Sequence, residues 1–329
     1  MAVRNRLFIG LFALAAWSQT SDKVFYFAHL NSPKEMQELT NVVRSIGDIR
    51  NASIDVASRS LTVKGTADQI AAAGWLIAEL DQTGSVPGAR EFLFNDVQAP
   101  RVQIVYLSHV DAPQDLQAIV NVVRSIADIQ RVLPIYEQKA VVMRGSPAQV
   151  KAAGWLLGVL DRPAGPEAVS APLEYKLPAT DWDARGGLIV QVTTLTRLQT
   201  PQAMQDVTNA IRSLSDIQRC FPVSSQRSLV MRASDGQIAL ANWLLKELDG
   251  PDGQGTKEFQ VGGPGNQVAQ VAYVNAATPQ SLQETVNQIR SETQILRVYP
   301  FNPQRAVAMR GTADQLARAQ HVVQSRQGQ

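Results

Sequence analysis

The residues that most often carry enzymatic chemistry are scarce in this sequence. Its 329 residues include three histidines, His29, His109 and His321, and one cysteine, Cys220. No His-Glu, Cys-x-x-Cys or aspartate-rich spacing of the kind that binds metal ions accompanies them. The sequence also lacks a Gly-x-Ser-x-Gly nucleophile turn and a phosphate-cradling glycine loop. We therefore expect a protein that is not an enzyme, with no cofactor, catalytic residue or metal site.

A repeated tryptophan is a better candidate for binding. It recurs on an expected helix at Trp75, Trp155 and Trp243, and His321 takes its place in the last copy. Burying a tryptophan removes about 150–250 Å² from water, so leaving the ring exposed forgoes several kcal/mol. Each ring therefore needs cover. The sequence leaves open whether a linker, the next module or a partner protein supplies it.

Repeated cations form the second candidate set. One recurs at an expected hairpin turn, at Arg59, Lys139, Arg227 and Arg305. Another follows on the return strand, at Lys64, Arg144, Arg232 and Arg310. We interpret them as solvated hairpins; the alternative is a surface for an anionic ligand, such as nucleic acid or lipid headgroups. The net charge of +2, from 31 basic and 29 acidic residues, argues against nucleic acid as a partner.

Both sets belong to a fourfold internal repeat. Residues 121–125, Asn-Val-Val-Arg-Ser, return in related form at 41–45, 209–213 and 287–291, and the copies align on the arginine without a gap. In each copy a glutamine and an asparagine precede the arginine by seven and three positions, as in Gln37, Asn41 and Arg44. This spacing puts the three side chains on one stripe of a helix. We interpret the stripe as structural, with a docking surface as the alternative.

Each copy is predicted to form a strand, a helix, two strands and a second helix. The sequence thus indicates an α+β protein of four tandem small βαββα modules, each a short sheet packed on two helices. We place the modules at residues 22–82, 91–162, 173–250 and 257–327. The alternating return strand 60–64 is predicted to be half-buried. Short β-like runs at 91–94, 173–177 and 257–261 are predicted to be extra edge strands.

The N-terminus has the pattern of a secretory signal peptide. Arg4 and Arg6 precede an apolar run from Leu7 to Trp17. The small residues Ala16 and Ser18 lie three and one positions before Gln19, as at a cleavage site, and Ala13 and Ala15 offer an alternative site. The run is shorter than the roughly 20 residues that a membrane-spanning helix needs. We therefore expect residues 1–18 to be removed, the mature chain to hold no integral membrane segment, and the protein to be periplasmic or otherwise exported.

The modules resemble the small periplasmic N-domains (NolW-like, short-domain repeats) of bacterial secretins. The resemblance lies in Leu-Thr-Val-Lys-Gly-Thr at 61–66, followed by a helix that ends in Leu80-Asp81, and it recurs in the later copies. It implies compact βαββα modules that stack end to end, assemble laterally into rings and contact secretion or pilus components. Two departures are Ser58-Arg59, where the family usually has Thr-Asn, and the lack of a segment for an outer-membrane barrel.

These observations lead to an expected function. The chain is predicted to be a periplasmic or cell-envelope scaffold of protein-interaction modules that belongs to a secretion or pilus-type assembly. Its expected partners are proteins of the envelope or the secretion machinery, with a homo-oligomer as a further alternative. A binding module for an anionic ligand, acting through the basic hairpins, is the alternative function.

Overall fold

A computed structural model describes residues 20–84, 88–95, 98–163, 171–179, 181–182, 187–251, 253–262, 265–274 and 278–327. The expected signal peptide lies outside these residues. The chain divides into two compact units, Met1–Thr83 and Gly84–Gln329.

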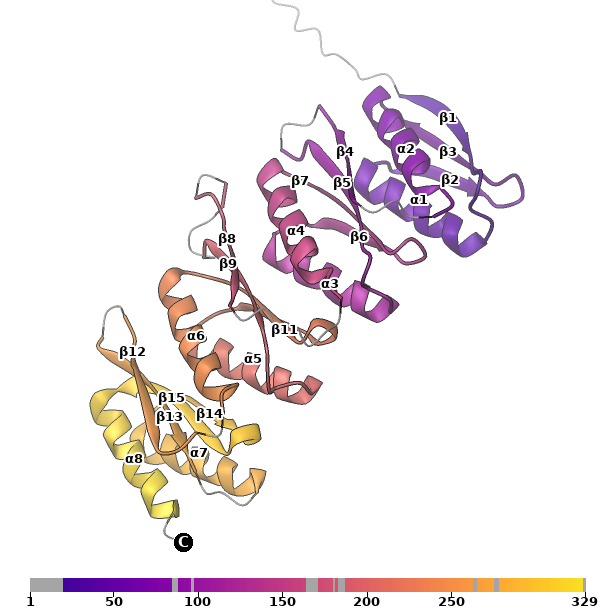
Figure 1. The fold of residues 1–329 in the computed structure, drawn as a ribbon. Coiled ribbons are helices and arrows are strands. Elements are labelled where there is room, and N and C mark those ends of the chain that lie inside the picture. The colour runs from indigo at the N-terminus through magenta and orange to yellow at the C-terminus, as the bar shows by residue number, and fades with distance from the viewer. Residues whose placement is uncertain are drawn as a thin grey trace, which may run out of the picture. The chain divides into compact units, whose positions relative to one another are not determined.

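The first unit contains one module. Its elements are β1 (Ser21–Tyr26), α1 (Pro33–Gly47), β2 (Asn51–Asp55), β3 (Ser60–Gly65) and α2 (Ala67–Leu80). The three strands form an antiparallel sheet in the order β1-β3-β2 (Figure 1).

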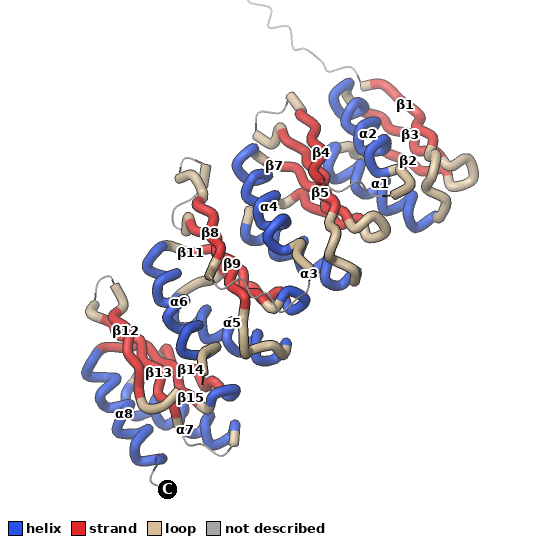
Figure 2. Tube along the Cα trace, in the orientation of Figure 1, coloured by secondary structure: helices blue, strands red, loops and turns tan. Residues whose placement is uncertain are grey.

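The second unit repeats this arrangement three times (Figure 2). The second module contains β4 (Gly88–Leu93), β5 (Arg101–Tyr106), α3 (Pro113–Ile126), β6 (Arg131–Ile135), β7 (Ala140–Gly145) and α4 (Pro147–Leu160). The third contains β8 (Leu173–Lys176), β9 (Ile189–Thr194), α5 (Pro201–Ser215), β10 (Arg219–Val223), β11 (Ser228–Ala233) and α6 (Asp235–Leu248). The fourth contains β12 (Thr256–Gln260), β13 (Gln267–Tyr273), α7 (Pro279–Thr293), β14 (Arg297–Phe301), β15 (Ala306–Thr312) and α8 (Ala313–Gln327). The predicted α+β fold class is confirmed.

The additional strands predicted between the modules are also present. β4, β8 and β12 each pair antiparallel with the first strand of the following repeat, so these sheets have four strands, in orders such as β4-β5-β7-β6. The proline-bearing strands β6, β10 and β14 lie at the opposite edge, as expected because proline cannot donate to a ladder. Short helical turns at Ser224–Gln226 and Asn302–Gln304 close the last two hairpins.

Capping explains where the helices begin. Proline occupies the first turn of α1, α3, α5 and α7, as the sequence predicts. The side-chain oxygens of Ser32 and Thr66 each accept the backbone N–H of the third helical residue. The side chain of that third residue in turn accepts the backbone N–H of the serine or threonine. Ala112 has no side-chain oxygen, so α3 begins without such a bond.

The Leu-Asp ending of the second helix has a definite structural role. The carboxylate of Asp81 accepts the backbone N–H groups of Ala28, His29 (2.9 Å) and Leu30 (2.8 Å), which form the loop before α1. Asp161 and Asp249 make the equivalent contacts in the second and third modules. The aspartate thus ties the end of the second helix to the loop that leads into the first helix.

The half-buried pattern predicted for the return strand at 60–64 is present in β3, where Leu61 and Val63 are buried and Lys64 is exposed. It does not extend to the later modules, because β11 is buried along its whole length. The reason is stacking: Val190 and Val230, on the outer face of the third sheet, share a core cluster with Leu116 and Leu156 of the second module's helices. Val271 and Ala308 of the fourth module likewise join a cluster with the third module's helices.

The copies also differ by one residue in length. Leu195 and Val274 are equivalent, because the N–H of each donates to the carbonyl of the hairpin-turn arginine, Arg227 or Arg305. The segment from Val274 to the helix at Pro279 is one residue shorter than that from Leu195 to Pro201. The gapless alignment is therefore wrong at the loop before α7.

Candidate interaction surfaces

The junction between the second and third modules is an ion-pair cluster. Asp128 follows α3 in the left-handed conformation, with φ 50°. Its carboxylate accepts from Arg219 at 2.7 Å and from Arg232 at 2.6 Å, and both arginines belong to the third module. Arg232 also donates to the carbonyls of Ile126 (3.2 Å) and Gly187 (2.9 Å). Its side chain is only 1% exposed, so this is an interior contact.

The charges at this junction favour the ionised carboxylate. Burial opposes the ionisation of Asp128, but the hydrogen bonds and positive charges of Arg219 and Arg232 outweigh it and hold the pKa below its ordinary value. Arg232 also lies over the Trp182 ring, 4.4 Å from the ring centroid.

The next junction repeats the same chemistry. Asp216, at the end of α5, contacts Arg297 at 2.7 Å and Arg310 at 3.1 Å. Arg310 also donates to the carbonyl of Leu214 at 2.8 Å. We call the contacts of Asp128 and Asp216 with these arginines the junction clamps. The interpretation of the return-strand cations as solvated is therefore wrong for Arg232 and Arg310. It is also wrong for Arg144, which is 5% exposed and donates to the carbonyl of Ala99 at 3.0 Å.

The two ends of the repeat differ at the clamp positions. Gln294 stands in the fourth module where Asp128 and Asp216 stand in the second and third. In the first module, Asn51 and Lys64 stand where the later modules have arginines. Lys64 lies 3.9 Å from Asp22 of its own sheet, and its side chain is 53% exposed. The first copy thus lacks the clamp arginines, and the last copy lacks the clamp aspartate.

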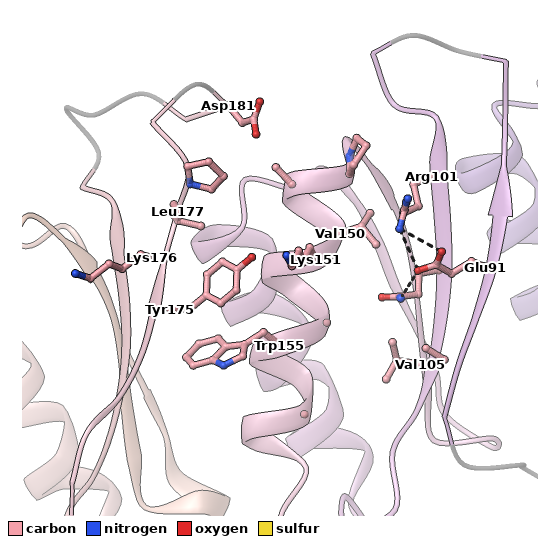
Figure 3. Close-up of a pocket in the computed structure, with 17 residues that line it drawn as sticks. Glu91, Arg101, Val105, Val150, Lys151, Trp155, Tyr175, Lys176, Leu177 and Asp181 are labelled. Atoms are coloured by element: carbon pink, nitrogen blue, oxygen red, sulfur yellow. Dashed lines mark hydrogen bonds and ion pairs between the residues drawn. The ribbon is translucent and has the colours of Figure 1, made fainter.

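Two of the three predicted tryptophans, Trp155 and Trp243, lie beside added strands. Trp155, on α4, packs against Tyr175 of β8 with ring centroids 5.3 Å apart, and Figure 3 shows the two rings facing each other. Trp243 packs against Phe259 of β12 at 5.5 Å. Both tryptophans are half-buried, so a linker strand covers one face of each ring. Trp75 is half-buried in the first unit.

A cleft of about 870 Å³ opens along α4 (Figure 3). Trp155 and Tyr175 lie on one side of the helix, and Glu91 and Arg101 lie on the other, 3.2 Å apart. Lys151 projects from the helix between the two sides. The lining mixes aromatic, acidic and basic groups.

The predicted hairpin cations all occupy the left-handed region of the backbone. Their φ values lie between 45° and 51°, at Arg59, Lys139, Arg227 and Arg305. The side chains of two are engaged within their own modules: Lys139 contacts Asp111 at 2.6 Å, and Arg59 donates to Asn31 at 2.9 Å. The lysine lowers the pKa of Asp111 through a hydrogen bond and its charge. The structure does not bring these cations together with the tryptophans into one site.

The polar stripe on the first helix makes structural contacts. Arg124 donates to the strand carbonyl of Val132 at 2.8 Å, and Arg290 donates to that of Val298 at 2.7 Å. The glutamine of the stripe donates to the asparagine at about one helical turn's distance in all four modules. These contacts support the structural interpretation.

The histidines and the cysteine form no reactive cluster among the residues that the structure describes. No group of three or more metal-binding side chains is found there. His109 lies 3.6 Å from Asp161, which holds the adjoining loop. Cys220 is buried, and burial raises the pKa of its thiol to about 12. No described helix combines the length and apolar character needed to cross a membrane.

Sequence reasoning missed the aspartates of the clamps and one arginine of each clamp, Arg219 or Arg297. Asp48, Asp128 and Asp216 recur at one place, with Gln294 in the fourth copy. The arginines at 131, 219 and 297 recur at another, with Asn51 in the first copy. The differences between copies could have revealed these contacts. The aspartate is missing only from the last copy and the arginine only from the first copy, as expected if each aspartate binds an arginine of the next module.

The fold and the clamps define a tandem array of βαββα modules. Comparison with known proteins finds no matching family model and no matching curated protein. Solved structures of secretins are similar to the chain. The N-terminal domain of the secretin XcpQ from Pseudomonas aeruginosa is 14% identical at a TM-score of 0.20, covering 44% of this chain and 63% of that chain.

Two larger structures give related values. Aeromonas hydrophila ExeD is 14% identical at a TM-score of 0.17, covering 92% of this chain and 55% of its own. The ETEC pilotin–secretin AspS–GspD complex gives 14% identity and a TM-score of 0.17, with 93% and 55% covered. The matches thus span between 55% and 63% of these chains. The likeness to secretin N-domains that the sequence motifs indicate is confirmed as a likeness.

Proposed function

We propose that the chain is an exported, non-enzymatic scaffold of the periplasm or cell envelope, and that its modules bind proteins of a secretion or pilus-type assembly. The observation that carries this proposal is the way successive modules in the second unit are joined. The sheets of the third and fourth modules share core clusters with the helices of the preceding module, and a clamp joins each of these two sheets to that module. Repeat proteins built in this way commonly present extended binding surfaces.

The candidate binding residues are those that the modules leave accessible. The cations at Arg59 and Arg305 are exposed at hairpin turns, whereas Trp155 and Trp243 retain only one partly open face. A partner that engages the tryptophans therefore contacts the added strand as well, because Tyr175 and Phe259 lie against the rings. The sequence resemblance to secretin N-domains supports a secretion-related setting.

Site-specific cross-linking in the native host tests this function. A photoreactive residue at Arg305 samples an exposed turn, and one at the buried Val142 is the matched control. We expect discrete cross-links from position 305 to envelope proteins or to a second copy, in the exported fraction only. A chain that stays in the cytoplasm, or that gives the same cross-links from both positions, contradicts the proposal.

The anionic-ligand alternative makes a different prediction. Binding to heparin or DNA through the hairpins would weaken steeply as salt rises. Lys139 and Arg59 are engaged by Asp111 and Asn31, which leaves fewer cations for such a ligand. We expect elution from heparin at low salt; tight retention that Arg227→Ala and Arg305→Ala abolish together would favour the alternative.

A further inference from the structure

Among the residues that the structure describes, the first sheet has no counterpart of the added strand found in the other three sheets. In the described part of the chain, β1 pairs only with β3 and forms the edge of a three-stranded sheet (Figure 1). The equivalent strands β5, β9 and β13 each pair on that side with an added strand. An uncovered edge strand presents backbone donors and acceptors to which another strand can pair.

The direction of the β1 backbone groups follows from one hydrogen bond. Phe27 donates its N–H inward, to the carbonyl of Arg59 at 2.8 Å. Since N–H groups alternate along a strand, those of Val24 and Tyr26 point to the open edge. In the fourth module, Tyr273 stands at the place of Tyr26 and donates outward to the carbonyl of Gly255 at 3.0 Å.

The side chains near this edge are also exposed. Val24 is 46% exposed and Tyr26 is 71% exposed. Their counterparts by strand register, Val271 and Tyr273, are 0% and 8% exposed, covered by the added strand and the preceding helices. β1 therefore carries apolar surface that is buried elsewhere in the repeat.

The added strands show what chemistry fits such an edge. Each contains a glutamate followed by an aromatic residue: Glu91-Phe92, Glu174-Tyr175 and Glu258-Phe259. The glutamate lies opposite a glutamine, Gln103, Gln191 or Gln270. Two of these glutamines donate to the glutamate at 2.9 Å, in the second and fourth modules.

In β1 the place of that glutamine is taken by Lys23. Its β3 partner is Val63, which matches the Met309 partner of Gln270. Lys23 is exposed, with its amine 5.0 Å from the Phe25 ring centroid. An acidic side chain opposite Lys23 would form an ion pair where the other modules form a neutral–anionic hydrogen bond.

We propose that β1 is a docking edge for an extended strand of a partner protein. The strand pairs antiparallel with β1 and places an acidic side chain opposite Lys23. A second copy of β1 does not supply this group. In an antiparallel pair, a residue whose N–H points away from the shared edge lies opposite a residue of the same kind, so Lys23 would face Ser21, Lys23 or Phe25 of the second copy and not Asp22. The proposal deepens the scaffold function and rests on it only for the existence of a partner.

A peptide titration tests the edge directly. The probe is a synthetic peptide of residues 88–93, Gly-Ala-Arg-Glu-Phe-Leu, added to the isotope-labelled intact chain and followed by amide chemical shifts. We expect the largest shifts at Asp22, Val24 and Tyr26. Val24→Pro removes an outward N–H without touching the β1–β3 ladder, so it should weaken binding at least about tenfold. Val24→Thr keeps the N–H and is the matched control.

A charge exchange tests the recognition of Lys23. Lys23→Glu should weaken binding of the glutamate peptide about two- to fivefold, the range of an exposed ion pair. A peptide with lysine in place of glutamate should recover that loss. Absence of binding, or binding that Val24→Pro leaves unchanged, overturns the proposal. So does self-association of the chain that Val24→Pro abolishes, since a second copy is then the occupant. Export plays no part in this titration, so the scaffold proposal can fail separately.

Discussion

Asp128 joins two arginines at the junction between the second and third modules. Its carboxylate is the shared acceptor for Arg219 and Arg232, and the Arg232 side chain is 1% exposed. Removing the acceptor leaves a buried guanidinium with fewer partners, which is more costly than losing a surface ion pair.

Asp128→Asn tests this cost. We expect the free energy of unfolding of the second unit to fall by about 1.5–3 kcal/mol, the range for hydrogen bonds to charged groups. Urea denaturation followed by circular dichroism measures it. Glu174→Gln makes the same charge change at an exposed position of β8 and should alter stability by less than about 0.5 kcal/mol. Equal effects of the two substitutions would contradict the clamp.

The pH dependence of the clamp has a defined sign. The folded-state pKa of Asp128 is below its ordinary value, so the clamp's stabilisation is fully present above the unfolded-state pKa of about 3.9 and is lost as pH falls through the lower folded-state pKa. We expect the stability difference between the wild type and Asp128→Asn to shrink when urea denaturation is repeated near pH 3. A difference that grows in acid would show the opposite linkage.

Asp249 illustrates a second repeated use of a carboxylate. It accepts the backbone N–H groups of Thr196, Arg197 and Leu198 at 2.6, 2.8 and 2.8 Å. Asp249→Asn puts an amide group among these donors, and we expect a loss of about 2 kcal/mol. Hydrogen exchange at residues 196–198 is the sensitive measurement, with Glu174→Gln again as the control. Unchanged protection there would show that the carboxylate does not hold the loop.

At the level of elements, β8 connects two modules. It pairs with β9 of the third module, and its Tyr175 packs on Trp155 of the second module. The same strand therefore completes one sheet and covers a helix of the preceding module. β12 has the equivalent position between Trp243 and β13.

A double-mutant cycle of Trp155→Ala and Tyr175→Ala tests this contact. Trp155 is half-buried, so we expect its substitution alone to cost about 2 kcal/mol, below the range for fully buried aromatic residues. The aromatic pair should give a coupling energy of about 0.5–1.5 kcal/mol. Additive effects would show that the rings do not stabilise each other. A loss of partner cross-linking without any loss of stability would make Trp155 a binding residue.

Much of each element was predictable, because local signals decide it. Serine and proline fix the start of α1, and the apolar spacing of Met36, Leu39 and Val43 fixes its buried face. The burial of β11 was not predictable from its own alternation. The second face of β11 is covered by the preceding module, and the sequence of one strand does not show which other module packs against it. The clamps are not visible in the features that all four copies share, because the substitutions that indicate them occur only in the first and last copies.

At the level of the whole molecule, Gly84–Gln329 is one compact unit that holds three modules. Core clusters run from the second module into the third, and from the third into the fourth. Separate small modules would each bury too little apolar surface for high stability, whereas shared interfaces let neighbours stabilise one another.

Native-state hydrogen exchange tests whether these three modules unfold together. It compares the slowest amides of β7, β11 and β15, one strand from each module of the second unit. We predict that the three strands exchange with the same opening free energy in the wild type, and that Asp128→Asn lowers the value for β7 relative to β15. Three unrelated opening free energies in the wild type, unchanged by Asp128→Asn, would contradict the account that the clamps join the modules into one cooperative stack.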